Sequence, residues 1–196
     1  MRILAPILLI LALSTNAFAQ RGDSWFGFAY NVSIPSGDTR NFIDQTSFRG
    51  VSMEGRKLIK DNVSFGFMAG WNVLNKETDE VVSLRDNIDI QGFQLRYINS
   101  FPIMLNSHYY FGQGGGIRPY VGLNAGTYII EQRVEIAAFL FDDNNWHFGL
   151  APEVGVTFPL GWRVAGFGMV RYNYAFSSGG TGAIQYWGIN LGVAWR

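Results

Sequence analysis

The chain has 196 residues, 24 of them glycine and none cysteine, and its 15 basic and 15 acidic residues give a formal net charge of zero. A balanced charge offers nucleic acid no electrostatic attraction, so we expect no nucleic-acid partner, and the lack of cysteine excludes disulfides and cysteine metal sites. Aromatic residues at 16% and hydrophobic residues at 48% are typical of a globular or a β-rich membrane protein.

The first segment of the chain is predicted to be a cleaved signal peptide, residues 1–19. It combines Arg2, an apolar stretch at 3–13 and a small-residue cleavage motif at 17–19, so that Gln20 would begin the mature protein. The alternative, an uncleaved anchor, conflicts with an apolar stretch too short to span a bilayer. No other stretch approaches 18 consecutive apolar residues, so we expect no transmembrane helix in the mature chain.

The remaining residues, 20–196, are predicted to form one domain of eight strands. Alternating apolar and polar residues occupy 24–34, 47–58, 63–73, 88–111, 119–136, 146–158, 162–176 and 186–196. Connections after the second, fourth and sixth strands are short, and the others are generally longer or more polar. This asymmetry is typical of outer-membrane barrels, with short turns in the periplasm and long loops outside, and it places both termini in the periplasm.

The alternation alone fits two architectures, a soluble barrel with an apolar interior and a membrane barrel with an apolar outer wall. The minority face consists mainly of Gly, Ala, Ser and Asn, which suit a narrow, filled lumen better than a water-exposed surface. Aromatic residues cluster near both strand ends, mostly about ten residues apart, which corresponds to roughly 25 Å of membrane height. The sequence therefore predicts an all-β, eight-stranded antiparallel up-and-down transmembrane barrel.

Several stretches resemble small eight-stranded outer-membrane β-barrel proteins of Gram-negative bacteria, the porin-like group with the OmpA-, OmpX- and OmpW-type barrels. They are "SWFGFAYNVSIP", "RPYVGLNAGTY", "APEVGV", "VRYNYAF" and the last strand. The resemblance implies a location in the outer membrane, with its lipid bilayer as partner, and insertion by the assembly machinery through the C-terminal strand. Asn190, Gly192 and Trp195 match that family's terminal pattern, whereas Arg196 stands where the pattern has an aromatic residue.

Four charged residues on the minority face are predicted to meet in the lumen: Glu54, Arg56, Glu153 and Arg171. If the sixth and seventh strands turn at 159–161, Glu153 and Arg171 lie at one height, with the other two projecting from the second strand. Opposite charges can pair there, since a lone buried charge would be costly. The structural interpretation is a plug that fixes the barrel; the functional one is a constriction that tunes the passage of small solutes.

A second candidate site lies where the alternation reverses beyond the expected membrane. In strand five the outward positions become charged at Glu131, Arg133 and Glu135, while the inward ones become aliphatic. The predicted apolar vestibule at the extracellular mouth comprises Ile88, Ile90, Ile98, Ile130, Val134 and Ile136. Two alternatives stay open: these residues pack against the loops, or a bulge at Pro102 reverses the faces of strand four.

The two histidines give no clear sign of catalysis. His108 is expected inside the barrel without a local serine partner, and His147 is expected as a solvated residue near Asp142 and Asp143 at the outer rim. We expect no enzyme activity, no cofactor and no metal site.

The favoured function is a structural role, or passage and binding of small molecules, including hydrophobic ones, at the cell surface. The first alternative is partner binding or adhesion through loops 36–46 and 75–87, and the second is a membrane-embedded hydrolase or acyltransferase. The surface ligand is unknown from sequence.

Overall fold

The computed structural model describes residues 24–85, 88–112, 116–136 and 139–196, and the side chains of these residues except 77–95 and 134–143. The predicted signal peptide lies outside the described residues. None of the described helices is long and apolar enough to cross a membrane.

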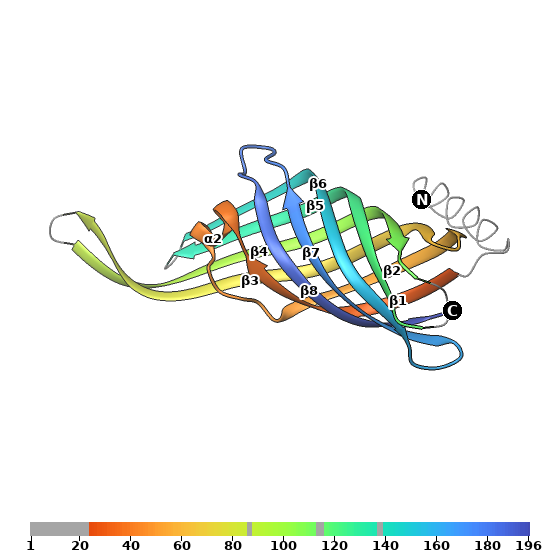
Figure 1. Cartoon of the computed structure of the whole chain (residues 1–196). Helices are drawn as coiled ribbons and strands as arrows, with labels where there is room; N and C mark the ends of the chain where they lie inside the picture. Colours follow the sequence, from red (N-terminus) through yellow and green to blue (C-terminus); the bar gives the residue numbers. More distant parts are fainter. Residues whose placement is uncertain (1–23, 86–87, 113–115, 137–138) are drawn as a thin grey trace, which may run out of the picture.

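Eight antiparallel strands close into one barrel, in the order of the sequence, with β1 paired to β8 (Figure 1). The elements are β1 (Ser24–Pro35), α2 (Gly37–Phe42), β2 (Arg49–Lys60), β3 (Val63–Arg85), β4 (Ile88–Tyr110), β5 (Arg118–Ile136), β6 (Phe139–Pro159), β7 (Val164–Ala175) and β8 (Ile184–Trp195). The predicted fold, an eight-stranded up-and-down barrel, is confirmed.

The barrel wall is apolar outside, and the lumen contains charged, polar and small side chains together with a buried apolar cluster. Leu105 and Leu191 on the outer wall are 73% and 65% exposed, whereas Glu54 and Arg56 are each 1% exposed. Burial alternates residue by residue along β1 and β8, as the pleat of a strand requires when one face is closed off. This is the opposite of a water-soluble barrel, and it is the arrangement that the small minority-face residues predicted.

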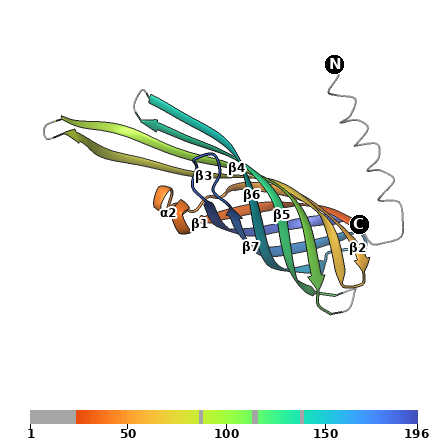
Figure 2. The same cartoon turned by 90° about the horizontal axis from the view of Figure 1, so that it is seen from above.

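Two hairpins extend far beyond the rest of the barrel. Strands β3 and β4 have 23 residues each, β5 has 19 and β6 has 21, against 12 in β1, β2, β7 and β8. The 11 additional residues of β3 add about 36 Å at 3.3 Å per residue. Figure 2 shows both hairpins projecting past the same end of the barrel, which we call the hairpin end. The opposite end, with the short connections and the last residue of β8, is the turn end.

The hairpins correct two predicted loops. Residues 75–87 were expected as a polar loop, but β3 continues to Arg85 and pairs with β4 along its whole length. Residues 142–145, which the predicted strands 119–136 and 146–158 leave as part of a connection, lie within β6. Polar residues fit these positions because backbone pairing, which does not depend on the polarity of the side chains, continues through both segments.

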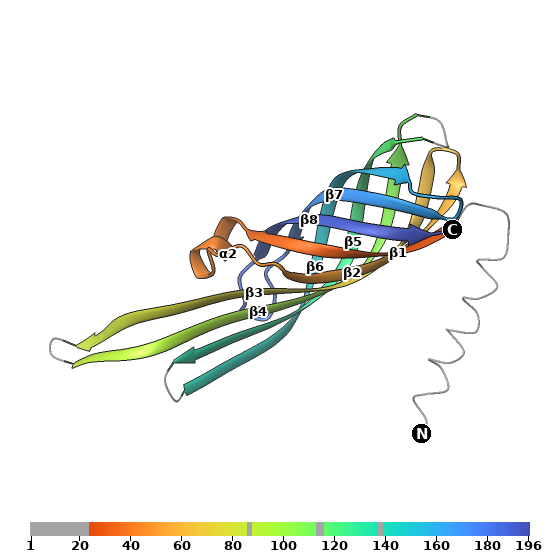
Figure 3. The ribbon, with the colours of Figure 1, turned by 90° about the horizontal axis from the view of Figure 1, so that it is seen from below.

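The connection from β1 to β2 folds back over the hairpin end (Figure 3). It contains the short helix α2, and backbone hydrogen bonds join Ser33 and Ser47 at its base. Gln185 of β8 donates its backbone N–H to Thr39 Oγ1 (2.7 Å). The predicted loop 36–46 is therefore an ordered cap on the mouth of the barrel.

Candidate functional site: a filled barrel lumen

The four charged residues predicted in the lumen lie in one network. Glu153 and Arg171 are register partners on β6 and β7, and Arg171 Nη2 lies 2.7 Å from Glu153 Oε2. Arg56 Nη2 lies 2.9 Å from Glu54 Oε1 and 3.2 Å from Glu153 Oε1. Arg171 Nη2 also lies 3.8 Å from Glu54 Oε2, so each arginine contacts both carboxylates.

Neighbouring polar and aromatic side chains complete this network. Asn124 donates to Glu153 Oε2 (2.8 Å), and the hydroxyls of Tyr110 and Tyr120 accept from Arg56, each at 3.1 Å. The Arg56 guanidinium lies 4.6 Å from the Trp25 ring centroid and 4.5 Å from that of Tyr120. Two positive and two negative charges balance each other, and the hydrogen bonds from Arg56, Arg171 and Asn124 to the carboxylates make a buried ionic cluster tolerable.

The network contains a serine–histidine contact that the sequence analysis missed. Ser64 Oγ lies 3.3 Å from His108 Nδ1, and His108 Nε2 lies 2.8 Å from Glu153 Oε1. Ser64 is 44 positions away along the chain and comes from the neighbouring strand β3, where Ser64 and His108 are register partners. This contact could have been predicted by aligning β3 and β4 as a hairpin and comparing the inward-facing residues that lie opposite each other.

The Ser64–His108–Glu153 arrangement lies among aromatic rings of the lumen. All three residues are buried, and the rings of Tyr110 and Tyr120 lie 6.3 and 5.3 Å from the histidine ring. A serine nucleophile needs a reacting carbon near its oxygen and donors for the resulting oxyanion. The contacts here instead fill the lumen, and the histidine joins β4 to β6.

His147 lies inside the barrel, not in solvent as expected from its neighbours. It is 0% exposed and pairs in register with Tyr128 of β5, and its Nδ1–H donates to the carbonyl oxygen of Phe176 (2.7 Å). The expectation was wrong because β6 begins at Phe139, so position 147 belongs to the wall of the barrel and not to a loop.

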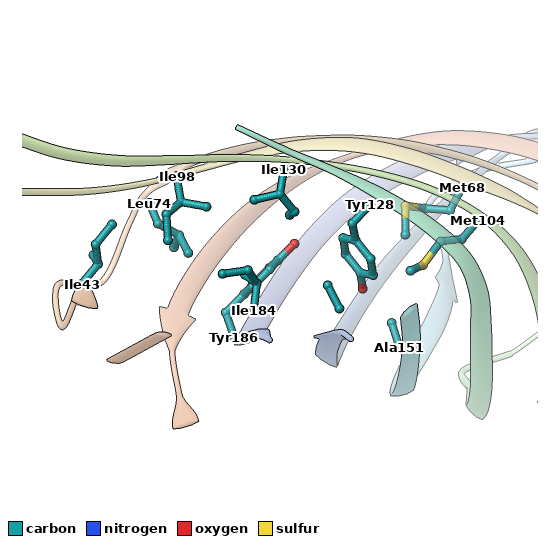
Figure 4. Packing of buried hydrophobic residues seen from close by; sticks show 11 residues of the cluster. Ile43, Met68, Leu74, Ile98, Met104, Tyr128, Ile130, Ala151, Ile184 and Tyr186 are labelled. Atoms are coloured by element: carbon teal, nitrogen blue, oxygen red, sulfur yellow. The ribbon is translucent and has the colours of Figure 1, made fainter. Parts of the chain in front are cut away.

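Above the ionic network the lumen is packed with apolar side chains (Figure 4). Ile98 and Ile130, two of the predicted vestibule residues, are buried in this cluster together with Leu74 and Ile43. Ile43 follows α2 and lies at one end of the cluster, beside Leu74 and Ile98 in Figure 4. The connection between β1 and β2 therefore occupies the space beside Ile98 and Ile130, where the predicted vestibule would be open.

The other vestibule residues, Ile88, Ile90, Val134 and Ile136, have side chains outside the described set. Their backbones lie in β4 and β5, and the register of these two strands runs without a shift from Gln94–Ile136 through Pro102 to Tyr110–Tyr120. The bulge at Pro102 that would have reversed the faces of β4 does not occur.

Aromatic rings mark the outer wall near the hairpin end. Trp71 and Phe101 stack at 6.1 Å between centroids, and Phe148 and Phe176 stack at 6.0 Å. Tyr172 and Trp187 lie 4.7 Å apart. Rings at this height on five different strands form the kind of belt that outer-membrane barrels place at the membrane–water interface.

A comparison with protein-family models gives one match, the "Outer membrane protein beta-barrel domain", over residues 5–196. The chain belongs to this family. Membership places it in the outer membrane, with its apolar wall in contact with the lipid bilayer. A search of curated proteins finds no match.

Solved structures of small barrels share the fold at low identity. Neisserial surface protein A is 14% identical, with a TM-score of 0.54 over 90% of this chain and 99% of that one. OprG from Pseudomonas aeruginosa is 16% identical, with a TM-score of 0.53 over 90% and 96%. Ail, the attachment invasion locus protein of Yersinia pestis, is 12% identical, with a TM-score of 0.51 over 90% and 100%. These similarities concern the fold alone.

Proposed function

We propose that this protein is a non-enzymatic binding protein of the cell surface, which presents its two long hairpins on a closed barrel. The observation that carries the proposal is the contrast between a lumen filled by ionic and apolar layers and two hairpins that extend well past it. We infer that the hairpin end faces outward and both termini face the periplasm, because long connections are extracellular in such barrels.

The hairpins carry strand edges suited to binding another chain. Strand β3 pairs with β2 only as far as Val73, yet it continues to Arg85. Strand β6 begins at Phe139, whereas its pairing with β7 starts at Gly149. The outer edges of β3 and β6 beyond these points present backbone donors and acceptors, which can pair with an extended segment of a partner.

Two measurements test this function. In planar bilayers the purified protein is expected to show no stepwise conductance, because charged and apolar layers fill the lumen. A variant in which residues 79–93 are replaced by Asn-Gly keeps the Thr78–Gln94 pair as its hairpin end and removes most of the β3 edge. It should insert normally but lose binding of cells to host-cell monolayers. Steady conductance, or unchanged cell binding, would contradict the proposal.

A second candidate function is binding of a small hydrophobic molecule at the mouth. It is favoured by the complete burial of Ile43, which shows that this site accepts an aliphatic group. Replacing Ile43 with Ala would open space there and should increase the fluorescence of bound N-phenyl-1-naphthylamine. Ile90→Asp and Val134→Asp should abolish that gain if both positions line the same site. No gain with Ile43→Ala would exclude this candidate.

A further inference from the structure

A row of residues that includes Arg49 and Glu131 crosses the outer wall directly above the aromatic belt. Arg49, Val73, Asn99 and Glu131 are successive register partners across β2, β3, β4 and β5. Residues two positions apart on a strand point to the same face. Val51, Trp71 and Phe101 lie on the outer face two positions nearer the turn end, so the residues of this row also point outward. The boundary between lipid-facing and water-facing wall therefore runs between these two rows.

A groove of about 530 Å³ lies across this boundary. It is lined by Tyr30, Phe48, Arg49, Gly50, Val51, Trp71, Val73, Tyr97, Asn99, Glu131 and Arg133. Val73 is only 7% exposed although its position faces outward, because the lining residues rise around it. The groove is thus a hollow in the wall and not a flat patch.

Specific contacts hold the walls of the groove in place. The Tyr30 hydroxyl donates to the carbonyl oxygen of Phe48, and the Ser47 hydroxyl donates to that of Val73. Trp71 Nε1 donates to Asn99 Oδ1 (3.4 Å), and Asn99 Nδ2 donates to Glu131 Oε2 (3.5 Å). The segment after α2 therefore forms one wall, and strands β4 and β5 form the other.

The two parts of the groove suit the two parts of an anionic lipid. Val51, Trp71 and Phe48 offer apolar surface at the level where acyl chains end. Arg49 and Arg133 offer two guanidinium groups above it, and guanidinium binds phosphate oxygens in bidentate geometry. Glu131, on the same strand as Arg133, adds one negative charge, so the lining of the groove keeps a net charge of +1.

A hollow at the turn end also has two arginines, Arg118 and Arg196, but its volume of about 20 Å³ is too small for a lipid. A second groove on the outer wall, between Phe67 and Phe148, has a volume of about 510 Å³, and all of its lining residues except Thr127 are apolar, so it suits an acyl chain without a headgroup. We propose that the groove around Arg49 and Trp71 binds a phosphorylated lipid of the outer leaflet, with the phosphate at the arginines and an acyl chain against Val51 and Trp71. This site is separate from the hairpin edges and independent of their function.

The test measures how tightly the full barrel retains bisphosphorylated lipid A, titrated into detergent micelles and read by native mass spectrometry. The double variant Arg49→Ala/Arg133→Ala should weaken binding by about tenfold or more, since each lost charge-assisted contact is worth at least severalfold. Val51→Trp should weaken it similarly by filling the apolar part. Arg40→Ala, which removes an exposed arginine of α2 outside the lining, is the matched control and should leave binding unchanged.

Further arms identify the source of the bound phosphate. The wild-type protein should bind dephosphorylated lipid A as weakly as the double arginine variant binds lipid A. Inorganic phosphate at millimolar concentration should not displace lipid A from the wild-type protein. Equal retention by wild type and the double variant would overturn the proposal, as would displacement by inorganic phosphate. A change of oligomeric state with Val51→Trp, without loss of lipid, would show instead that the groove binds a second copy of the chain. Heat-dependent migration on gels verifies that every variant is folded.

Discussion

Removal of the Glu153 carboxylate is the sharpest test of the buried network. Glu153 accepts hydrogen bonds from four side chains, those of Arg171, Arg56, His108 and Asn124. In Glu153→Ala, two arginines would share the single carboxylate of Glu54. Removing one partner of a buried ion pair typically costs about 3–5 kcal/mol, and we expect a loss near the upper end because several donors lose their acceptor.

A charge-balanced variant separates the lost pairing from the lost volume. Glu153→Leu/Arg171→Leu leaves Glu54 and Arg56 as a neutral pair 2.9 Å apart. Replacing both members of a buried pair with apolar residues is often close to neutral, so this double variant should be at least about 2 kcal/mol more stable than Glu153→Leu alone. Reversible urea unfolding of the barrel from thin lipid vesicles, followed by tryptophan fluorescence, measures each free energy.

Two results would refute the reasoning. A cost below about 1 kcal/mol for Glu153→Ala would mean that water reaches the arginines and replaces the carboxylate. A double variant less stable than Glu153→Leu would mean that the shapes of these side chains matter more than the balance of charge.

Three further predictions concern the wall and the cap. Leu105→Arg should cost about 2–4 kcal/mol of unfolding free energy, with Leu105→Met close to neutral, because the side chain is 73% exposed on the apolar outer wall. Gly66→Ala should cost about 1–3 kcal/mol, because a Cβ would lie 1.9 Å from the carbonyl oxygen of Gly55, whereas Gly182→Ala, which meets open space, should not. Asp44, hydrogen-bonded by Lys76, has its pKa lowered from 3.8, so it favours the ordered cap above pH 3.8 and loses this effect as pH falls through the lower, folded-state pKa.

Each of these has a direct readout. Unfolding in lipid vesicles gives the first two, and a Leu105→Arg barrel as stable as wild type would place this face in water. Carboxyl NMR titration gives the third, where Lys76→Ala should move the Asp44 pKa upward. An unchanged titration would show that the Lys76–Asp44 contact is absent in the membrane-embedded protein.

The sequence by itself determined the strand number, the closed barrel and which face meets lipid. These follow from local rules: side chains alternate along a strand, and small residues opposite large apolar ones are distinctive of a narrow barrel. The inward positions of Glu54, Arg56, Glu153 and Arg171 followed from the same parity. A shift of one residue in the assignment of inward and outward positions would have placed all four charged side chains in lipid.

Only the tertiary structure decided which side chains contact each other across the lumen and at which residues the strands end. The Ser64–His108 contact depends on the register between β3 and β4, which no local pattern encodes. Residues 75–85 read as a loop because they are mostly polar, whereas the backbone hydrogen bonds that pair them with β4 leave no local signal in the sequence. Ile43 lies in the connection between β1 and β2 and fills the mouth of the barrel. The other residues of its cluster include members of β3, β4 and β8, so this contact forms only after the connection folds back over the barrel.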